Sequence, residues 1–178
     1  MRRAFLALIL FALSSLAHAG MTFFAMAVAP SEVEAVAADD STWEALEKER
    51  DGSTVDLDKA WHGLHYLLTN SAWDSESTLG QALMGGTPIG KDRGYGPLRL
   101  LQPDQVRDVA DALGQLSRDM LARRFDPAAM ERAQIYPSGI WEGEGPEALD
   151  DLLVHFDLLR DFYRKAAERR RSVLLLIS

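Results

Sequence analysis

Two histidines stand three residues apart in the segment Trp61-His62-Gly63-Leu64-His65. On a helix this spacing places both imidazoles on neighbouring positions, where they could act as acid–base groups or as metal ligands. The segment lacks the glutamate and the four-residue spacing of a zinc-protease helix, and the chain contains no cysteine. We therefore expect no metal site. The plainer interpretation is that a histidine here donates a hydrogen bond to a loop carbonyl.

Aromatic side chains accompany the glycine- and proline-rich stretches of the chain. Tyr95 lies in the glycine-rich stretch 86–97, and Tyr136 and Trp141 flank a turn at residues 137–139. Aromatic residues in such loops often line a ligand pocket or a partner surface. The candidate binding residues are therefore Trp61, His62, His65, Tyr95, Arg99, Tyr136 and Trp141.

Two members of this set have ordinary alternatives. Arg99 could bind a carboxylate at the mouth of the glycine-rich loop, but a surface salt bridge is the commoner role of such an arginine. Trp61 is centred in an apolar stripe with Leu57, Leu64 and Leu68, so core packing is its ordinary role.

Familiar catalytic motifs are absent from the sequence. No glycine-rich loop continues into a lysine followed by serine or threonine, and the glycines miss the dinucleotide-binding spacing. No serine lies in a Gly-x-Ser-x-Gly context, and no cysteine can serve as a nucleophile. Carboxylates are plentiful but lie mainly on polar helix faces. We therefore expect no cofactor and assign no catalytic residue.

The composition describes an acidic globular domain. The 178 residues are 47% hydrophobic and 26% charged, and 27 acidic against 19 basic side chains give a net charge of -8. An acidic surface repels phosphate backbones, so we expect no nucleic-acid partner. The same charge favours association with a basic protein.

The first 19 residues have the pattern of a secretory signal peptide. A positively charged start precedes an apolar run at residues 4–13, and Ala17-His18-Ala19 supplies the small residues of a cleavage site. Cleavage would leave a single domain, residues 20–178, in the periplasm or outside the cell. Two alternatives stay open. An uncleaved segment would anchor the protein in a membrane, and translation from Met21 would give a cytoplasmic protein.

The apolar pattern predicts an α+β fold. Runs at residues 21–28, 98–101 and 173–177 predict about three strands, with the two terminal strands adjacent in one small, mostly buried sheet. Six or seven helices are expected to cover this sheet, because so few strands cannot bury a core alone. The clearest is an amphipathic helix from Asp56 to about Thr69, and the longest runs from Glu147 to about Glu168.

Two further helices are predicted by local signals. A short one is expected at residues 42–50, and another begins at Pro103, because proline suits the first helical position.

Five segments carry a resemblance to a known family: Asp56-Leu-Asp-Lys-Ala-Trp-His-Gly-Leu-His-Tyr-Leu-Leu-Thr69, Gly94-Tyr-Gly-Pro97, Leu101-Gln-Pro103, Ile135-Tyr-Pro137 and Ile140-Trp141. Together they resemble the YfbM-like family of small bacterial proteins, a domain of unknown function. The resemblance runs from about Gly20 to Ile177. It implies a single α+β domain without an established activity and without agreed catalytic residues.

The leading hypothesis for function is a non-enzymatic binding module for a basic protein partner, with immunity proteins as one such kind. The first alternative is a small enzyme or small-molecule binder whose pocket gathers the histidine, tyrosine, tryptophan and arginine candidates. The second alternative is that these residues are purely architectural. The sequence does not specify the activity, the substrate, the partner or the oligomeric state.

Overall fold

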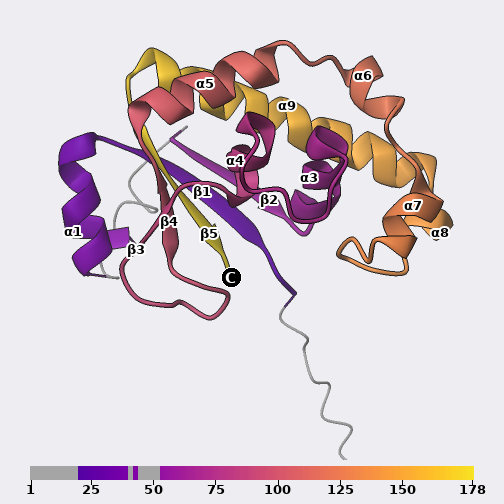
Figure 1. The fold of residues 1–178 in the computed structure, drawn as a ribbon, viewed down its shortest axis with the longest axis horizontal. Helices are drawn as coiled ribbons and strands as arrows, with labels where there is room; N and C mark the ends of the chain where they lie inside the picture. The colour runs from indigo at the N-terminus through magenta and orange to yellow at the C-terminus, as the bar shows by residue number, and fades with distance from the viewer. Residues whose placement is uncertain (1–19, 40–41, 44–52) are drawn as a thin grey trace, which may run out of the picture.

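The computed structural model describes residues 20–39, 42–43 and 53–178, which form an antiparallel sheet with helices packed over it (Figure 1). The sheet has five strands in the order β2-β1-β5-β4-β3, and every neighbouring pair is antiparallel. The strands are β1 (Phe23–Val28), β2 (Thr54–Asp58), β3 (Thr87–Ile89), β4 (Leu98–Leu101) and β5 (Ser172–Ile177).

The described residues also form eight α-helices and one short 3-10 turn. They are η1 (Pro30–Glu32), α1 (Val33–Ala38), α3 (Trp61–Thr69), α4 (Thr78–Met84), α5 (Pro103–Gly114), α6 (Arg118–Ala122), α7 (Pro127–Arg132), α8 (Trp141–Glu144) and α9 (Pro146–Glu168). The predicted α+β class is therefore confirmed, although the sheet has more strands and the domain more helices than expected.

Both ends of the described chain meet in the middle of the sheet. β1 and β5 pair along their whole length, from Phe23 opposite Ile177 to Val28 opposite Ser172. Their apolar runs are buried on both faces because alternate side chains point to opposite sides of a strand. One set packs against α3, α5 and α9, and the other packs with Val36 of α1 and with Trp43. The predicted adjacency of the terminal strands is confirmed.

Three short elements differ from the prediction, and each has a physical reason. The helix expected from Asp56 begins only at Trp61, because residues 54–58 form β2. Within β2, Val55 and Leu57 are buried while Asp56 and Asp58 are exposed, which is the alternation of a strand. β3 lies inside the glycine-rich stretch, and α8 is a single turn that begins at Trp141, just after the turn predicted at residues 137–139. Elements of three or four residues are too short to show a period.

Other boundaries follow the sequence signals closely. α5 begins at Pro103, a residue suited to the first helical turn. α3 ends at Thr69, and Asn70 follows it in the left-handed conformation with φ of 57°. The predicted signal peptide at 1–19 and most of a helix predicted at 42–50 lie outside the described residues. Within the described part of the chain, no helix is both long and apolar enough to cross a membrane.

Candidate functional site

Helix α3 places three of the predicted site residues in the core. Trp61 and His62 are 1% exposed, and His65 is fully buried. The indole Nε1 of Trp61 donates a hydrogen bond to the carbonyl oxygen of Met21 at 3.1 Å, which ties the helix to the chain before β1. The indole and the imidazole of His62 stack with ring centroids 4.8 Å apart. Trp61 therefore has the core-packing role that its apolar neighbours predict.

His62 joins α3 to two loops. Its Nδ1 accepts a hydrogen bond from the backbone N–H of Tyr136 at 3.0 Å, so the ring proton resides on Nε2. Nε2 in turn donates to the carbonyl oxygen of Ala72 at 2.9 Å. Burial lowers the pKa of His62, while the bond to Ala72 acts in the opposite direction. The ring is thus neutral at pH 7, and main-chain groups occupy both nitrogens.

His65 is buried in a different way, because neither ring nitrogen has a hydrogen-bond partner among the described residues. Burial lowers its pKa to about 4, and the nearby His62 adds to that effect while Asp74 opposes it. No solvent-facing surface of this ring is available to a ligand. Across the described residues, no group of three or more histidines and carboxylates is arranged to hold a metal ion.

Tyr95 and Arg99 lie apart from the α3 histidines. They line a small hollow with Leu83, Pro97 and the end of β5. Arg99 donates from Nε to the carbonyl oxygen of Gly85 at 2.7 Å and from Nη2 to that of Gly86 at 2.9 Å. The surface salt bridge expected for Arg99 is therefore replaced by main-chain hydrogen bonds. Tyr95, in contrast, is 56% exposed.

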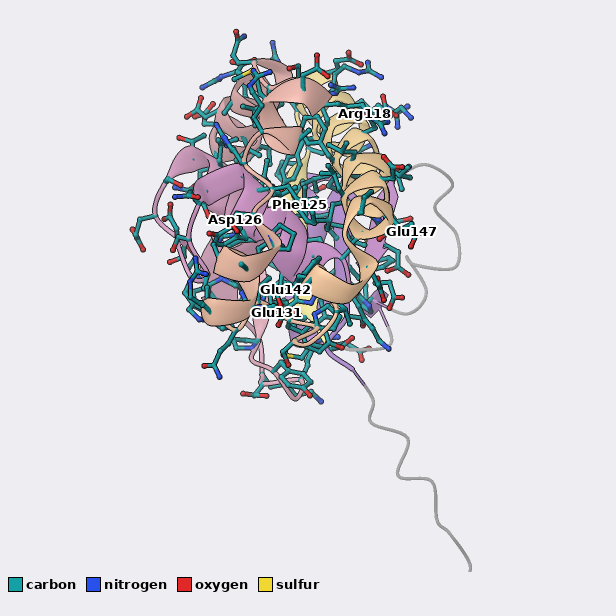
Figure 2. All side chains as sticks on the ribbon, turned by 90° about the vertical axis from the view of Figure 1, so that its right-hand side faces the viewer. Arg118, Phe125, Asp126, Glu131, Glu142 and Glu147 are labelled. Atoms are coloured by element: carbon teal, nitrogen blue, oxygen red, sulfur yellow. The ribbon has the colours of Figure 1, made fainter. Side chains whose placement is uncertain are left out.

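The loop between α7 and α8 is fixed by hydrogen bonds from several sides. The carboxylate of Glu131 accepts from the backbone N–H groups of Gly139 at 2.9 Å and of Trp141 at 2.8 Å. The indole Nε1 of Trp141 donates to the carbonyl oxygen of Ile135 at 2.8 Å. Figure 2 looks onto this end of the molecule, where α7, α8 and the start of α9 come together.

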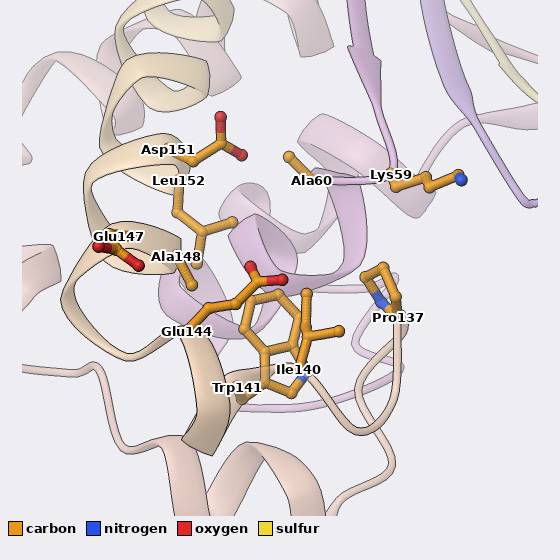
Figure 3. Close-up of a pocket in the computed structure, with 10 residues that line it drawn as sticks. All are labelled: Lys59, Ala60, Pro137, Ile140, Trp141, Glu144, Glu147, Ala148, Asp151 and Leu152. Carbon is orange, nitrogen blue, oxygen red and sulfur yellow. The ribbon is translucent and has the colours of Figure 1, made fainter.

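A pocket of about 170 Å³ lies between this loop and α9 (Figure 3). Its buried floor is apolar, with Trp141, Ala148 and Leu152 no more than 5% exposed. Its rim carries three exposed carboxylates. The complete lining is Lys59, Ala60, Pro137, Ile140, Trp141, Glu144, Glu147, Ala148, Asp151 and Leu152.

The charges at the rim favour a positively charged ligand. The carboxylates of Glu144 and Asp151 point over the pocket, whereas the ammonium group of Lys59 points away from it (Figure 3). Among the described residues, no ion pair neutralises Glu144 or Glu147. Asp151 lies 3.4 Å from Nδ1 of His155. The pocket therefore presents unbalanced negative charge above an aromatic floor.

The seven predicted site residues do not line one common pocket. Trp141 alone among them lines the pocket beside α9, and this pocket shares no residue with the hollow at Tyr95 and Arg99. Tyr136 contributes its backbone N–H to His62. The sequence prediction missed the rim carboxylates and Glu131. A signal for the rim was present, because residues 142–151 contain five carboxylates and no basic side chain.

Comparisons with known proteins agree with this fold. The chain matches the family described as Domain of unknown function (DUF1877) over residues 20–176. Among solved structures it is similar to that of YfbM from Escherichia coli, a protein of unknown function, with a TM-score of 0.71 and 20% sequence identity. That similarity covers 88% of this chain and 99% of the YfbM chain.

No curated protein matches the chain. At 20% identity the similarity to the YfbM structure supports the fold and gives no information about a ligand. The resemblance to the YfbM-like family, predicted from the Asp56–Thr69 segment and from the four shorter segments between Gly94 and Trp141, is confirmed. The chain belongs to the family described as Domain of unknown function (DUF1877).

Proposed function

We propose that this protein is a non-enzymatic binding module that captures a basic side chain of a partner protein in the pocket beside α9. One observation carries the proposal: the carboxylates of Glu144 and Asp151 point over an apolar floor, and Glu147 adds a third carboxylate to the lining. Lys59 is the cation in the lining, and its ammonium group points away from the pocket.

A lysine or arginine side chain has the two chemical features that this pocket complements. Its methylene stem would pack on Ile140 and Trp141, and its charged head would lie among the carboxylates. Charge-assisted hydrogen bonds are about twice as strong as neutral ones, and a cation near a tryptophan ring gains further attraction. The volume of about 170 Å³ is below the range of roughly 300–1,000 Å³ typical of small-molecule sites. A single side chain therefore fits the pocket better than a larger ligand.

The net charge supports the same class of partner. A protein with a net charge of -8 attracts basic proteins over long range, and salt weakens this steering. Neutralising a basic toxin, as an immunity protein does, is one function that such a surface would serve. The structure gives less support to the enzyme alternative, because main-chain groups occupy both nitrogens of His62 and His65 is fully buried.

A lysine-rich peptide tests the proposal by calorimetry at low and high salt. The pocket variant combines Glu144→Gln, Glu147→Gln and Asp151→Asn. The matched control combines Glu76→Gln, Asp111→Asn and Asp119→Asn, three exposed carboxylates outside the pocket lining, so both variants lose the same charge. We expect the pocket variant to bind the peptide at least about tenfold more weakly than the parent, a loss of about 1.4 kcal/mol.

The control variant should bind almost as tightly as the parent. Equal weakening in both variants would show that only net charge matters, and it would overturn the pocket as the site. Failure of the parent to bind the peptide at low salt would overturn the proposal as well. If free lysine methyl ester binds as tightly as the peptide, the small-molecule alternative replaces the protein partner.

A further inference from the structure

The outer face of α9 combines exposed aliphatic side chains with charges of both signs. Val154 and Leu158 are each 50% exposed. They lie four residues apart and therefore share one face of the helix. The larger apolar residues elsewhere on α9, such as Phe156 and Leu159, are buried. This leaves an aliphatic pair in the middle of an otherwise polar surface.

Opposite charges flank the aliphatic pair. Residues 142–151 supply five carboxylates and no basic side chain, whereas residues 164–171 supply five basic side chains and one carboxylate. The helix dipole accounts for an acidic start and a basic end. It does not account for two half-exposed aliphatic side chains between them.

We propose that a second copy of this chain docks antiparallel on the outer face of α9. A two-fold axis near Val154 and Leu158 would place these side chains against their counterparts. The acidic start of each helix would then face the basic end of the other, with Glu147 opposite Lys165. Lys165 pairs with Asp161 on its own helix, and the contact would give its ammonium group a second carboxylate. The adjacent edge strand β2 is a poor alternative, because its exposed Asp56 and Asp58 would bring like charges together.

The dimensions of this face predict a weak, concentration-dependent dimer. α9 has 23 residues, which corresponds to about 35 Å of helix. With a width of roughly 10 Å, the face covers about 350 Å², less than the ~800 Å² per partner of a standard interface. Because charge pairs flank its centre, association should weaken as salt is raised.

Sedimentation velocity over a range of protein concentrations tests the dimer at low and high salt. We expect the parent to dimerise at low salt and Leu158→Asp to remain monomeric at every concentration. Tyr95→Asp is the matched control, because it places the same charge at another exposed apolar side chain, and it should dimerise like the parent. Circular dichroism verifies that both variants are folded.

Charge reversal tests the antiparallel arrangement itself. Glu147→Lys and Lys165→Glu should each weaken self-association, because each places like charges opposite one another. An equimolar mixture of the two variants restores opposite charges at both contacts, so it should associate at least about tenfold more tightly than either variant alone. A monomeric parent at low salt, a dimeric Leu158→Asp variant or a mixture without gain would each overturn the proposal. Leu158 is outside the pocket lining, so its substitution leaves binding of the lysine peptide as a separate measurement.

Discussion

The histidine region of α3 and the carboxylate region of α8 and α9 differ in how they hold ionisable side chains: the first buries them and the second leaves them exposed. In α3, burial removes the charge from His62 and His65, and main-chain groups occupy the polar atoms of His62. At the pocket, Glu144, Glu147 and Asp151 stay exposed around an apolar floor. The two histidines that suggest chemistry in the sequence are buried in the core, and ordinary carboxylates line the pocket that we propose as the binding site.

The two regions are in contact through Gly63 of α3 and Trp141 of the pocket floor. A Cβ atom on Gly63 of α3 would collide with the ring of Trp141, so only glycine lets the helix approach the pocket floor this closely. His62 and Glu131 hold the same loop from different sides through Tyr136, Gly139 and Trp141. The open pocket therefore depends on the closed core behind it.

The largest expected effect distinguishes a buried tryptophan from an exposed one. Trp141 is 2% exposed and forms the pocket floor, whereas Trp73 is 66% exposed and covers the ring of His62. Trp141→Ala should lower the free energy of unfolding by about 3–5 kcal/mol, because it leaves a cavity in the core. Trp73→Ala should cost less than about 1 kcal/mol. Urea unfolding measures both, and equal losses would contradict the distinction between core and surface.

The second effect is the loss of folding stability at acidic pH that the lowered pKa of His65 predicts. Its pKa of about 4 in the folded chain lies below its ordinary value of 6.5, so the unfolded chain takes up a proton that the folded chain does not. The stability due to neutral His65 is fully present above pH 6.5 and is lost as the pH falls towards 4. A difference of about 2.5 pKa units corresponds to about 3 kcal/mol.

The substitution His65→Leu isolates this effect. The variant keeps an apolar group of similar size and removes two buried nitrogens that lack partners among the described residues. Its unfolding free energy should fall less steeply than that of the parent between pH 6.5 and 4. The lowered pKa of His62 and the carboxylates act in both proteins, so the difference between the two curves belongs to His65. Parallel curves would show that His65 is not held neutral by the fold.

The sequence predicted the parts of the fold that have strong local signals. Pro103 predicted the start of α5, and the apolar run at 173–177 predicted β5. Both signals lie within the segment itself and do not depend on tertiary contacts. Leu57 misled the prediction, since a residue four positions before Trp61 also fits a helical face. The strand became evident only through its pairing with β1.

The candidate site was harder to predict because its residues gain their role from position. Glu144, Glu147 and Asp151 look like the carboxylates of any polar helix face, and only the packing of α8 against α9 gathers them around Trp141. His62 illustrates the reverse case. Its residue type is conspicuous, yet its hydrogen bonds to Ala72 and Tyr136 come from loops whose positions no local pattern specifies.

The smallest expected effect tests whether the hydrogen bonds of Glu131 to the loop hold Trp141 in place at the pocket floor. Glu131→Gln retains one acceptor oxygen for the loop but directs an amide N–H group towards the other backbone donor. We expect a loss of about 1 kcal/mol in unfolding free energy, since the carboxylate is only partly buried. The loop that carries Trp141 would loosen, so the lysine peptide should bind a few-fold more weakly although every rim carboxylate remains. Glu142→Gln, an exposed carboxylate on α8 outside the pocket lining, is the control and should change stability by less than about 0.5 kcal/mol. Unchanged peptide binding in Glu131→Gln would mean that the pocket does not depend on the Glu131 hydrogen bonds.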